Sequence, residues 1–456
     1  MSTLEKIFIK ESEIKAFDIK HRNIIRFNIS KYNAAFEKGK LQYSNLDSAK
    51  SQSSLIKKKV INSLDYYLTE FENNFTKNGG KVLWAKDEHE AMNHVVNILS
   101  GINAKLIVKS KSMTTEEIDF NEALQNAGIE SVETDLGEFI VQIAGEKPYH
   151  IVTPVMHKSK ETISELFNKI YGTPPNSTPE FITAFVRDLL RKKFITADAG
   201  ITGANFLIAD TGSVCVTENE GNALMATSFP KVHIAIAGIE KLIPSVSDLH
   251  LFWPLLATHG TGQHITAYNS IFSGPKKKDE IDGPEEMYVI LIDNGRSNLL
   301  ADNKIIEALS CIRCGACLNA CPVYKNIGGY TYKSTYSGPI GSVITPHLKN
   351  FNEYKHLSYA SSLCGKCYEV CPVKINLPYL LLYNRNLAVK TKQSKFAERQ
   401  LIKGWKLIIK NRMLMNLAGG NAKNLVFNLF FKKLWGKRRN LPIFPKKSFN
   451  QQYKKD

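Results

Sequence analysis

The sequence predicts an α/β domain, followed by a cysteine-rich module and a basic, helical C-terminal region. Between Lys81 and Arg296, short apolar runs alternate with helix-like stretches, as in folds whose helices cover a largely buried sheet. Seven of the eight cysteines lie between Cys311 and Cys371. Residues 381–456 carry 19 Lys and Arg but only two acids, so they hold the whole formal net charge of +17.

The α/β domain is predicted from seven apolar runs that resemble strands. These runs are KVLWA, KLIVK, YHIVTPV, ANFLIAD, GSVCVTE, KVHIAIAGI and MYVILID. DEHEAMNHVVNIL and PEFITAFVRDLLRKKF have helical patterning, as does much of the Lys- and Asn-rich start of the chain. With 456 residues, the chain is long enough for several domains. We expect a helical lead-in at 1–75, an α/β domain at 76–297, a cysteine-rich module at 298–382 and a basic helical region at 383–456.

The positive charge is concentrated in the C-terminal region, which indicates the class of partner that this region binds. The chain before residue 381 has 41 basic and 41 acidic residues, so a basic tail follows a neutral body. In LVFNLFFKKLWGKRR, apolar side chains alternate with lysines, which favours a membrane surface or an apolar partner over nucleic acid. Packing of this helix within the protein itself is the alternative. No apolar run has the length of a membrane span and the start lacks a signal-peptide core, so we expect a cytoplasmic protein.

The first cysteine motif is CIRCGACLNACP, which has the C-x2-C-x2-C-x3-C-P spacing of two-cluster ferredoxins. It supplies Cys311, Cys314, Cys317 and Cys321. In such motifs the first three thiolates hold one 4Fe-4S cluster, and the fourth reaches the other cluster. Zinc is the competing interpretation, but zinc sites usually use two ligand pairs that lie well apart in the sequence. The motif therefore predicts iron–sulfur clusters.

The second motif, SSLCGKCYEVCP, has Ser361 where a ferredoxin has its first cysteine. Applied to both motifs, the crossed arrangement assigns Cys311, Cys314, Cys317 and Cys371 to cluster 1 and Cys321, Cys364 and Cys367 to cluster 2. The second cluster then has three thiolates. Three alternatives complete it: Ser361 as an alkoxide, an iron open to water or to a partner's ligand, or a 3Fe-4S cluster. Ser361 could instead cap a helix beside the cluster.

Two further features have alternative interpretations. Cys215, in GSVCVTE, is either a distant ligand or a buried apolar cysteine on a strand, and the second is the common state of a free thiol. Glu218 and Glu220 follow the same strand in TENEGN. They lie either at an α/β site or in a solvated loop.

The chain resembles the lactate utilization protein B family, in which an N-terminal LUD domain precedes a two-cluster ferredoxin module. The motifs that carry the resemblance are VKSKSMTTEEI, ETDLGEFIVQI, ITGANFLIADTGSV, TENEGN, DGPEEMYVILIDNGRS, CIRCGACLNACPVY and LCGKCYEVCPVKI. The resemblance implies an α/β fold similar to NagB, ribose-5-phosphate isomerase and CoA-transferases. The family shares the shortened second motif. The resemblance therefore implies that three thiolates are the normal cysteine ligands of the second cluster.

The resemblance also implies a place in a three-component cytoplasmic system that oxidises L-lactate to pyruvate. The partners would be a cysteine-rich iron–sulfur subunit and a smaller LUD-domain subunit. We expect an electron-transfer subunit rather than a complete enzyme, because two one-electron centres suit a two-electron oxidation and no catalytic base is evident. The alternative is a non-catalytic iron–sulfur scaffold or sensor whose basic tail binds nucleic acid or membrane.

Overall fold

The computed structural model describes residues 2–393, 396–416, 418–435 and 440–453. Two compact units make up the chain, Met1–Arg385 and Asn386–Asp456. In the described part of the chain, no helix is both long enough and apolar enough to cross a membrane.

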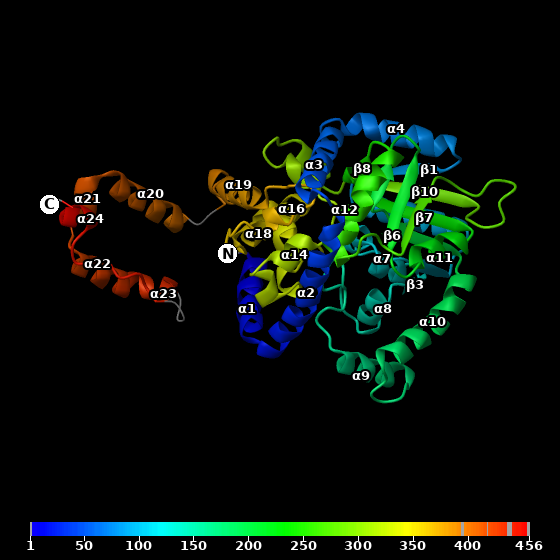
Figure 1. Cartoon of the computed structure of the whole chain (residues 1–456), viewed down its shortest axis with the longest axis horizontal. Coiled ribbons are helices and arrows are strands. Elements are labelled where there is room, and N and C mark those ends of the chain that lie inside the picture. The colour runs from blue at the N-terminus through cyan, green and yellow to red at the C-terminus, as the bar shows by residue number, and fades with distance from the viewer. Residues whose placement is uncertain (1, 394–395, 417, 436–439, 454–456) are drawn as a thin grey trace. The chain divides into compact units, whose positions relative to one another are not determined.

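A six-stranded parallel sheet forms the centre of the first unit (Figure 1). In spatial order, its strands are β1 (Lys81–Ala85), β10 (Glu286–Ile292), β7 (Val232–Gly238), β4 (Ala199–Gly203), β2 (Leu106–Lys109) and β3 (Glu130–Glu133). The strands are all parallel, but the order in which the chain adds them to the sheet reverses between β2 and β4. β3 lies on one side of β2, whereas β4, β7 and β10 follow one another on the other side. Such a reversal opens a crevice at the carboxyl ends of the two central strands.

Helices cover both faces of this sheet because successive strand side chains point to opposite sides. Ile107 of β2 packs with the helices on one face, and Val108 packs with those on the other. The first group is α5 (Glu88–Gly101) and α7 (Phe120–Asn126), and the second is α8 (Leu136–Ile143), α9 (Lys160–Tyr171), α10 (Pro179–Thr196) and α11 (Asn222–Ser228). Gly200 lets α11 approach β4, since a Cβ there would lie 1.7 Å from the carbonyl oxygen of Ala226.

A second, mixed sheet packs beside the first. Its order is β8 (Leu242–Ile243), β5 (Phe206–Ile208), β6 (Ser213–Glu218) and β9 (Tyr268–Phe272). β6 is antiparallel to both of its neighbours. All α/β elements predicted above are found except the strand YHIVTPV at 149–155, and that prediction is wrong. The segment turns instead: Tyr149 N–H donates to the carbonyl of Pro154 (2.9 Å), and Pro154 has no N–H for a strand ladder.

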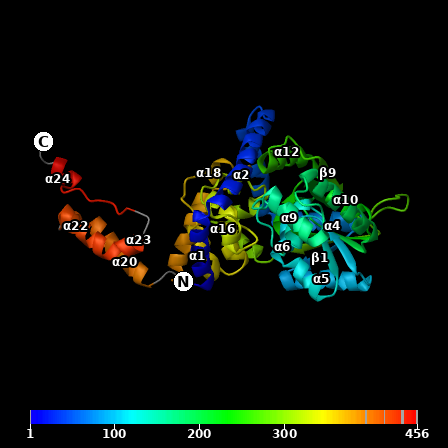
Figure 2. The ribbon, with the colours of Figure 1, turned by 90° about the horizontal axis from the view of Figure 1, so that it is seen from below.

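The N-terminal helices pack against the cysteine-rich module, as Figures 1 and 2 both show. They are α1 (Thr3–Phe17), α2 (Ile19–Gly39) and α3 (Leu46–Asn62), whereas the following α4 (Leu64–Lys77) packs against β1, β6 and β8. The module consists of short helices, among them α14 (Ala316–Ala320), α15 (Tyr324–Ile327), α16 (Gly338–Leu348) and α18 (Lys366–Glu369). α1 and α2 contact α15, and α3 contacts Ile306–Ser310 just before the first motif. One hydrophobic core therefore joins the N-terminal helices, the second sheet and the cysteine-rich module.

Candidate iron–sulfur site and adjoining cavity

The first cysteine motif forms a tight loop that leads into α14. Arg313 (φ 59°) and Gly315 (φ 78°) adopt left-handed backbone conformations, which let the chain turn around a central space. Cys314 and Cys317 are buried, and Cys311 is half-buried. Backbone N–H groups point at the sulfur atoms: Arg313 N–H donates to Cys311 Sγ (3.4 Å).

Four cysteine side chains gather in what we call the first thiol set: Cys311, Cys314, Cys317 and Cys371. Burial raises the pKa of Cys314, and the neighbouring thiols of Cys311 and Cys371 raise it further. Burial raises the pKa of Cys317 too, with Cys311 and Cys314 adding to the effect. The same four residues line one small cavity, together with apolar side chains such as Ile340 and Ile375. The fold thus brings Cys371 from the second motif to three cysteines of the first.

The second thiol set is Cys321, Cys364 and Cys367. Burial, followed by the thiols of Cys321 and Cys364, raises the pKa of Cys367 to about 12. Burial also raises the pKa of Cys321, with a further increase from Cys364. Cys364 itself is exposed, unlike its two companions. The two sets are those that the crossed ferredoxin pattern assigns to clusters 1 and 2, and ligation itself stays a prediction.

The spacing of the thiols distinguishes a cluster from a single zinc ion. Zn–S bonds are about 2.3 Å long, so two thiolates on one zinc lie at most about 4.6 Å apart. Among the described residues, no three cysteine sulfurs lie within 4.8 Å of one another. Nε and Nη1 of Arg313 are buried beside the first thiol set without a hydrogen-bond partner. Donors of this kind suit the sulfur atoms of a bound cluster, so these residues fit an iron–sulfur group better than zinc.

Ser361 lies beside the second thiol set, but its hydroxyl takes part in a local turn. Ser361 Oγ accepts a hydrogen bond from the N–H of Leu363 (3.1 Å). The guanidinium of Arg385 donates to the Ser361 carbonyl (3.3 Å). This geometry favours a structural hydroxyl over an alkoxide ligand.

Cys215 lies away from both thiol sets, in the core beside β6. Its side chain is fully buried, and its sulfur accepts a hydrogen bond from Trp253 Nε1 (3.1 Å). Burial raises the pKa of Cys215 to about 12. A thiol in this environment stays protonated and packs as an apolar group, as the sequence interpretation favoured.

Buried cations surround the first thiol set. The ammonium of Lys50 donates to the carbonyl of Glu369 (2.8 Å). Burial lowers the pKa of Lys50, and the nearby thiols of Cys371 and Cys314 partly offset this decrease. Burial likewise lowers the pKa of Lys57 to about 7 and that of Lys241 to about 8. Sequence reasoning missed these residues, because nothing in the lysine-rich α3 marks Lys50 and Lys57 as the lysines that turn inward, and Lys241 follows β7 in no recognisable motif.

A buried ion network connects the sheet to the first motif. Arg296 forms a bidentate pair with Glu117 (2.9 and 2.9 Å) and a second pair with Glu240 (2.5 Å). Glu240 also pairs with Arg313 of the first motif (3.3 Å). Burial opposes ionisation of Glu240, but Arg296 and then Arg313 lower its pKa to about 2. The hydroxyl of Tyr336 donates to Glu117 (2.6 Å), so both parts of the unit hold the network in place.

A cavity of ≈ 560 Å³ opens at the carboxyl ends of β2 and β4, and we call it the β2/β4 cavity. Ser110 to Ser112 follow β2 along its wall, and Gly203 to Asn205 follow β4. Arg313 and Cys314 of the first motif form part of the same wall. Glu218 and Glu220 also line it, although Glu220 is exposed, so a role of these two acids in a site stays a prediction.

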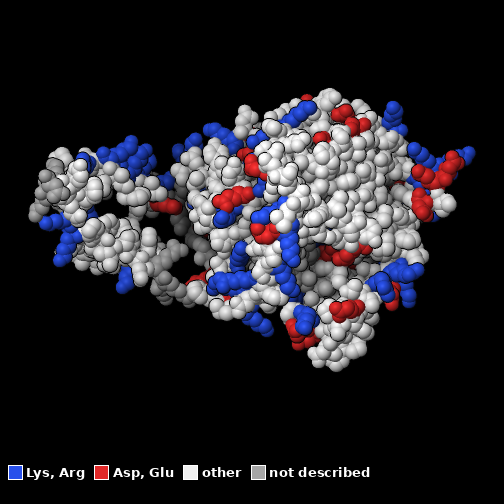
Figure 3. Space-filling view, viewed as in Figure 1, with Lys and Arg blue, Asp and Glu red and all other residues white. Residues whose placement is uncertain are grey.

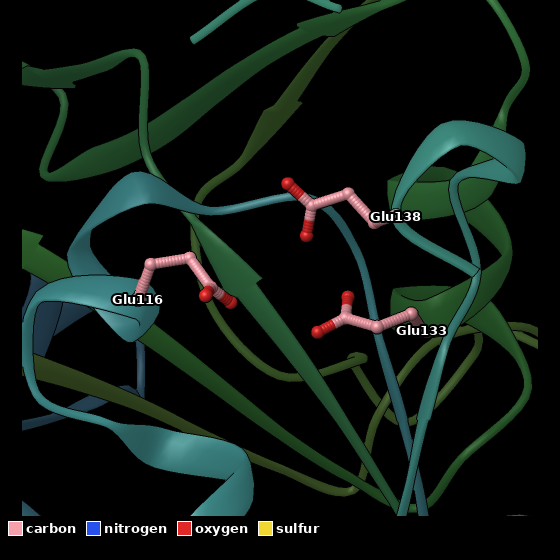
Figure 4. A group of neighbouring side chains, drawn as sticks. All are labelled: Glu116, Glu133 and Glu138. Carbon is pink, nitrogen blue, oxygen red and sulfur yellow. The ribbon is translucent and has the colours of Figure 1, made fainter. Parts of the chain in front are cut away.

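Three glutamates converge around one buried lysine beneath this cavity. Figure 4 shows the carboxylates of Glu116, Glu133 and Glu138 pointing toward one another. The ammonium of Lys109 lies 2.8 Å from Glu133, 3.6 Å from Glu116 and 3.7 Å from Glu138. Burial alone would lower the pKa of Lys109, but Glu133, Glu138 and Glu116 together raise it above its usual value. The ammonium thus already supplies the cation that a group of carboxylates requires.

Comparisons with known proteins agree with this architecture. The LUD domain family matches residues 68–292, and the 4Fe-4S dicluster domain family matches residues 307–375. Lactate utilization protein B of Bacillus cytotoxicus is 42% identical over 411 residues, which cover 88% of this chain and 86% of that protein. Its counterpart in Bacillus subtilis is 45% identical over 368 residues, 80% of this chain and 77% of the relative.

A third relative carries a different name. The Escherichia coli protein named "Uncharacterized electron transport protein YkgF" is 40% identical over 416 residues, 89% of this chain and 87% of that protein. The matches to the Bacillus cytotoxicus and Escherichia coli proteins cover 88% and 89% of this chain, which is enough to include both the parallel sheet and the cysteine motifs. The chain therefore belongs to the lactate utilization protein B family, with a LUD domain followed by a 4Fe-4S dicluster domain.

Proposed function

We propose that this protein is the iron–sulfur electron-transfer subunit of a cytoplasmic complex that oxidises L-lactate to pyruvate. The observation that carries the proposal is the gathering of seven cysteines into two thiol sets within one module. The names of the relatives, which refer to lactate utilization and electron transport, support the same conclusion. The proposed partners are a cysteine-rich iron–sulfur subunit and a smaller LUD-domain subunit.

In this proposal the first thiol set holds a 4Fe-4S cluster, and the second thiol set holds another cluster that lacks a fourth cysteine. Bound clusters supply one-electron carriers. The protein's own residues set their environment. Buried cations such as Lys50 and Arg313 stabilise the more negative, reduced state, and the apolar walls exclude water from the first set.

The second thiol set is the proposed point of electron exchange with a partner subunit. Cys364 is exposed, and the rings of Tyr359 and Tyr368 are also exposed nearby in the sequence. Exposed aromatic side chains are typical of protein interfaces. A partner that covers this surface would lie close to the second set and could complete its coordination.

The C-terminal unit is the proposed contact with a membrane surface. In α20 (Phe396–Lys410), apolar side chains share one helical face and are all exposed: Leu401, Ile402, Trp405, Ile408 and Ile409. Lys403, Lys406 and Lys410 flank this face. Figure 3 shows Lys and Arg far outnumbering acids on the visible side of this unit. Such helices bind in the plane of anionic membranes.

The test is anaerobic purification with and without the two partner subunits, followed by iron and sulfide analysis and EPR. We expect two distinguishable centres in the isolated protein. L-lactate should reduce them only when the partners are present. Iron near four per chain with a single EPR centre would contradict two clusters, and failure of lactate to reduce either centre in the complete complex would contradict the electron-transfer role.

A further inference from the structure

We propose that the β2/β4 cavity binds a small 2-hydroxycarboxylate, with the ammonium of Lys241 as the counter-ion for its carboxylate, beside the first thiol set. This inference rests on the proposed function and assigns the acid a place on this chain rather than on a partner. Its basis is the position of the cavity, the pairing of its charged groups and its contact with the first motif.

The cavity occupies the position where parallel α/β sheets bind ligands. In these folds, ligands bind outside the carboxyl ends of the strands, where the strand order reverses. Here the reversal lies between β2 and β4, and residues directly after both strands line the cavity. A Cβ at Gly203 would lie 2.6 Å from Ser112 Oγ, so glycine is required where the two strand ends meet.

Lys241 is the cation in the cavity wall that is free for a ligand. Lys111 donates to the carbonyl of Val152, and Arg313 pairs with Glu240. No hydrogen bond or ion pair to the Lys241 ammonium is present among the residues that the structure describes, although the residue is only 9% exposed. The charge of Glu240 partly offsets the cost of burying this ammonium, and an added anion would offset it further. A carboxylate ligand would provide that anion through a charge-assisted hydrogen bond.

The acids of the cavity are already held, but they retain acceptor capacity. Glu218 accepts from the N–H groups of Ala223 (2.8 Å) and Leu224 (3.0 Å). Asp135, the third acid of the wall, accepts from the N–H of Glu138 (3.0 Å). Glu220 accepts from the side-chain amide of Asn222 (3.0 Å). Each carboxylate has about four lone-pair sites, so it can also accept the hydroxyl of a ligand. A cation for the carboxylate and an acceptor for the hydroxyl are the two groups that a 2-hydroxy acid requires.

The cavity also places such a ligand next to the first thiol set. Cys314 lines its wall, and the thiol of Cys311 influences the ionisation of Lys241. A carboxylate on Lys241 therefore lies at the end of the cavity nearest to the proposed cluster 1. The acid needs only a fraction of the ≈ 560 Å³, and water or a partner's residue can fill the remainder.

The test uses the full chain with its clusters, anaerobically and without partner subunits. L-lactate binding is titrated by calorimetry. EPR spectra of the reduced protein are recorded at each molar ratio of L-lactate to protein. Propionate, which lacks the hydroxyl, is the comparison ligand. We expect L-lactate to bind more tightly than propionate and to change the signal of one centre only. Lys241→Met should weaken L-lactate binding about tenfold or more.

Lys231→Met is the matched control. Lys231 precedes β7, whereas Lys241 follows it at the other end, and the Lys231 side chain is 78% exposed. This variant should bind L-lactate as the unchanged protein does. Ala204→Leu fills part of the cavity without altering its charge and should also weaken L-lactate binding. If Lys241→Met loses its clusters, this second variant tests whether the ligand occupies the cavity.

The outcomes separate this inference from the proposed function. Absence of binding to the cluster-loaded chain, or unchanged binding in an iron-replete Lys241→Met variant, would overturn the inference. Unchanged binding in Ala204→Leu would do the same. In those cases, lactate-dependent reduction in the complete complex would still support the electron-transfer role. Normal binding without reduction in the complex would instead leave the inference standing and contradict the proposed function.

Discussion

The two thiol sets differ in depth, in surrounding charge and in number of sulfur atoms. The first set has four cysteines, of which three are buried, and adjoins the β2/β4 cavity. Lys50, Lys57 and Arg313 lie around it. The second set has three cysteines, and Cys364 is exposed. The same ferredoxin motif has thus been placed in two environments within one short module.

This difference suggests a direction for electron flow. Positive charge near the first thiol set stabilises an added electron there. Exposure of the second set favours passing it to a docked partner. The N-terminal helices create the contrast, because α3 contributes Lys50 and Lys57 to the first set. In the proposed function, the lead-in therefore contributes charged residues to the surroundings of cluster 1.

The largest expected effect comes from removing one ligand of the first thiol set. Cys314→Ser should remove about four irons per chain and largely abolish lactate-dependent electron flow, because a buried cubane needs its thiolates. Cys364→Ser should affect the other centre. Iron analysis and EPR distinguish the two variants. Cys215→Ser is the control and should keep both centres, and loss of a cluster there would reopen the ligand assignment.

The second expected effect concerns stability in air. With three thiolates and an exposed cysteine, the second centre should convert to a three-iron form before the first centre changes. Ser361→Cys should add the missing thiolate and slow this loss, as followed by EPR during timed exposure to oxygen.

Ser361→Ala is the matched control for that substitution. Because the Ser361 hydroxyl accepts from Leu363 N–H in the structure, removing it should leave the EPR signal unchanged. A new or lost signal would mean that the hydroxyl does bind iron. Equal air stability of both centres, unaffected by either substitution, would contradict the three-thiolate assignment.

Sequence patterns could predict the elements but not this asymmetry. Apolar runs marked six of the ten described strands but missed β3, β4, β8 and β9, whose short segments carry few apolar residues or several polar ones. Cysteine spacing marked every proposed ligand. Lys57, Lys58 and Lys59 are consecutive lysines, yet only Lys57 is buried. The helix turns Lys57 inward, where its ammonium donates to the carbonyls of Glu240 and Leu242. Local composition does not show which of several neighbouring lysines faces the core.

The cavity was unpredictable for a related reason. Its wall combines Lys111, Glu218, Lys241 and Arg313, which come from four distant segments and meet only through the strand order. The wrong strand prediction at 149–155 has the same origin. Its apolar residues do pack in a core, but they do so as a turn between the sheet and the first motif.

A smaller effect is expected from the charge around the first thiol set. Lys50→Met should lower the reduction potential of cluster 1 by roughly 50 mV, because loss of a nearby cation destabilises the reduced state. EPR-monitored redox titration measures the shift. Lys59→Met, an exposed position on the same helix, is the control and should leave both potentials unchanged. An equal shift of both centres by Lys50→Met would contradict the proposed asymmetry.

The smallest effect on either centre is expected from the C-terminal unit. Trp405→Ser combined with Ile408→Ser removes two exposed apolar residues from α20 and should leave both EPR signals and the iron content unchanged. The same variant should bind less to vesicles that contain anionic phosphatidylglycerol, measured by co-sedimentation, because the apolar face of an interfacial helix provides much of its binding energy. Neutral phosphatidylcholine vesicles are the control and should bind neither protein well. Undiminished binding to anionic vesicles would contradict membrane contact through α20, and altered EPR signals would mean that the environments of the two thiol sets depend on the C-terminal unit as well.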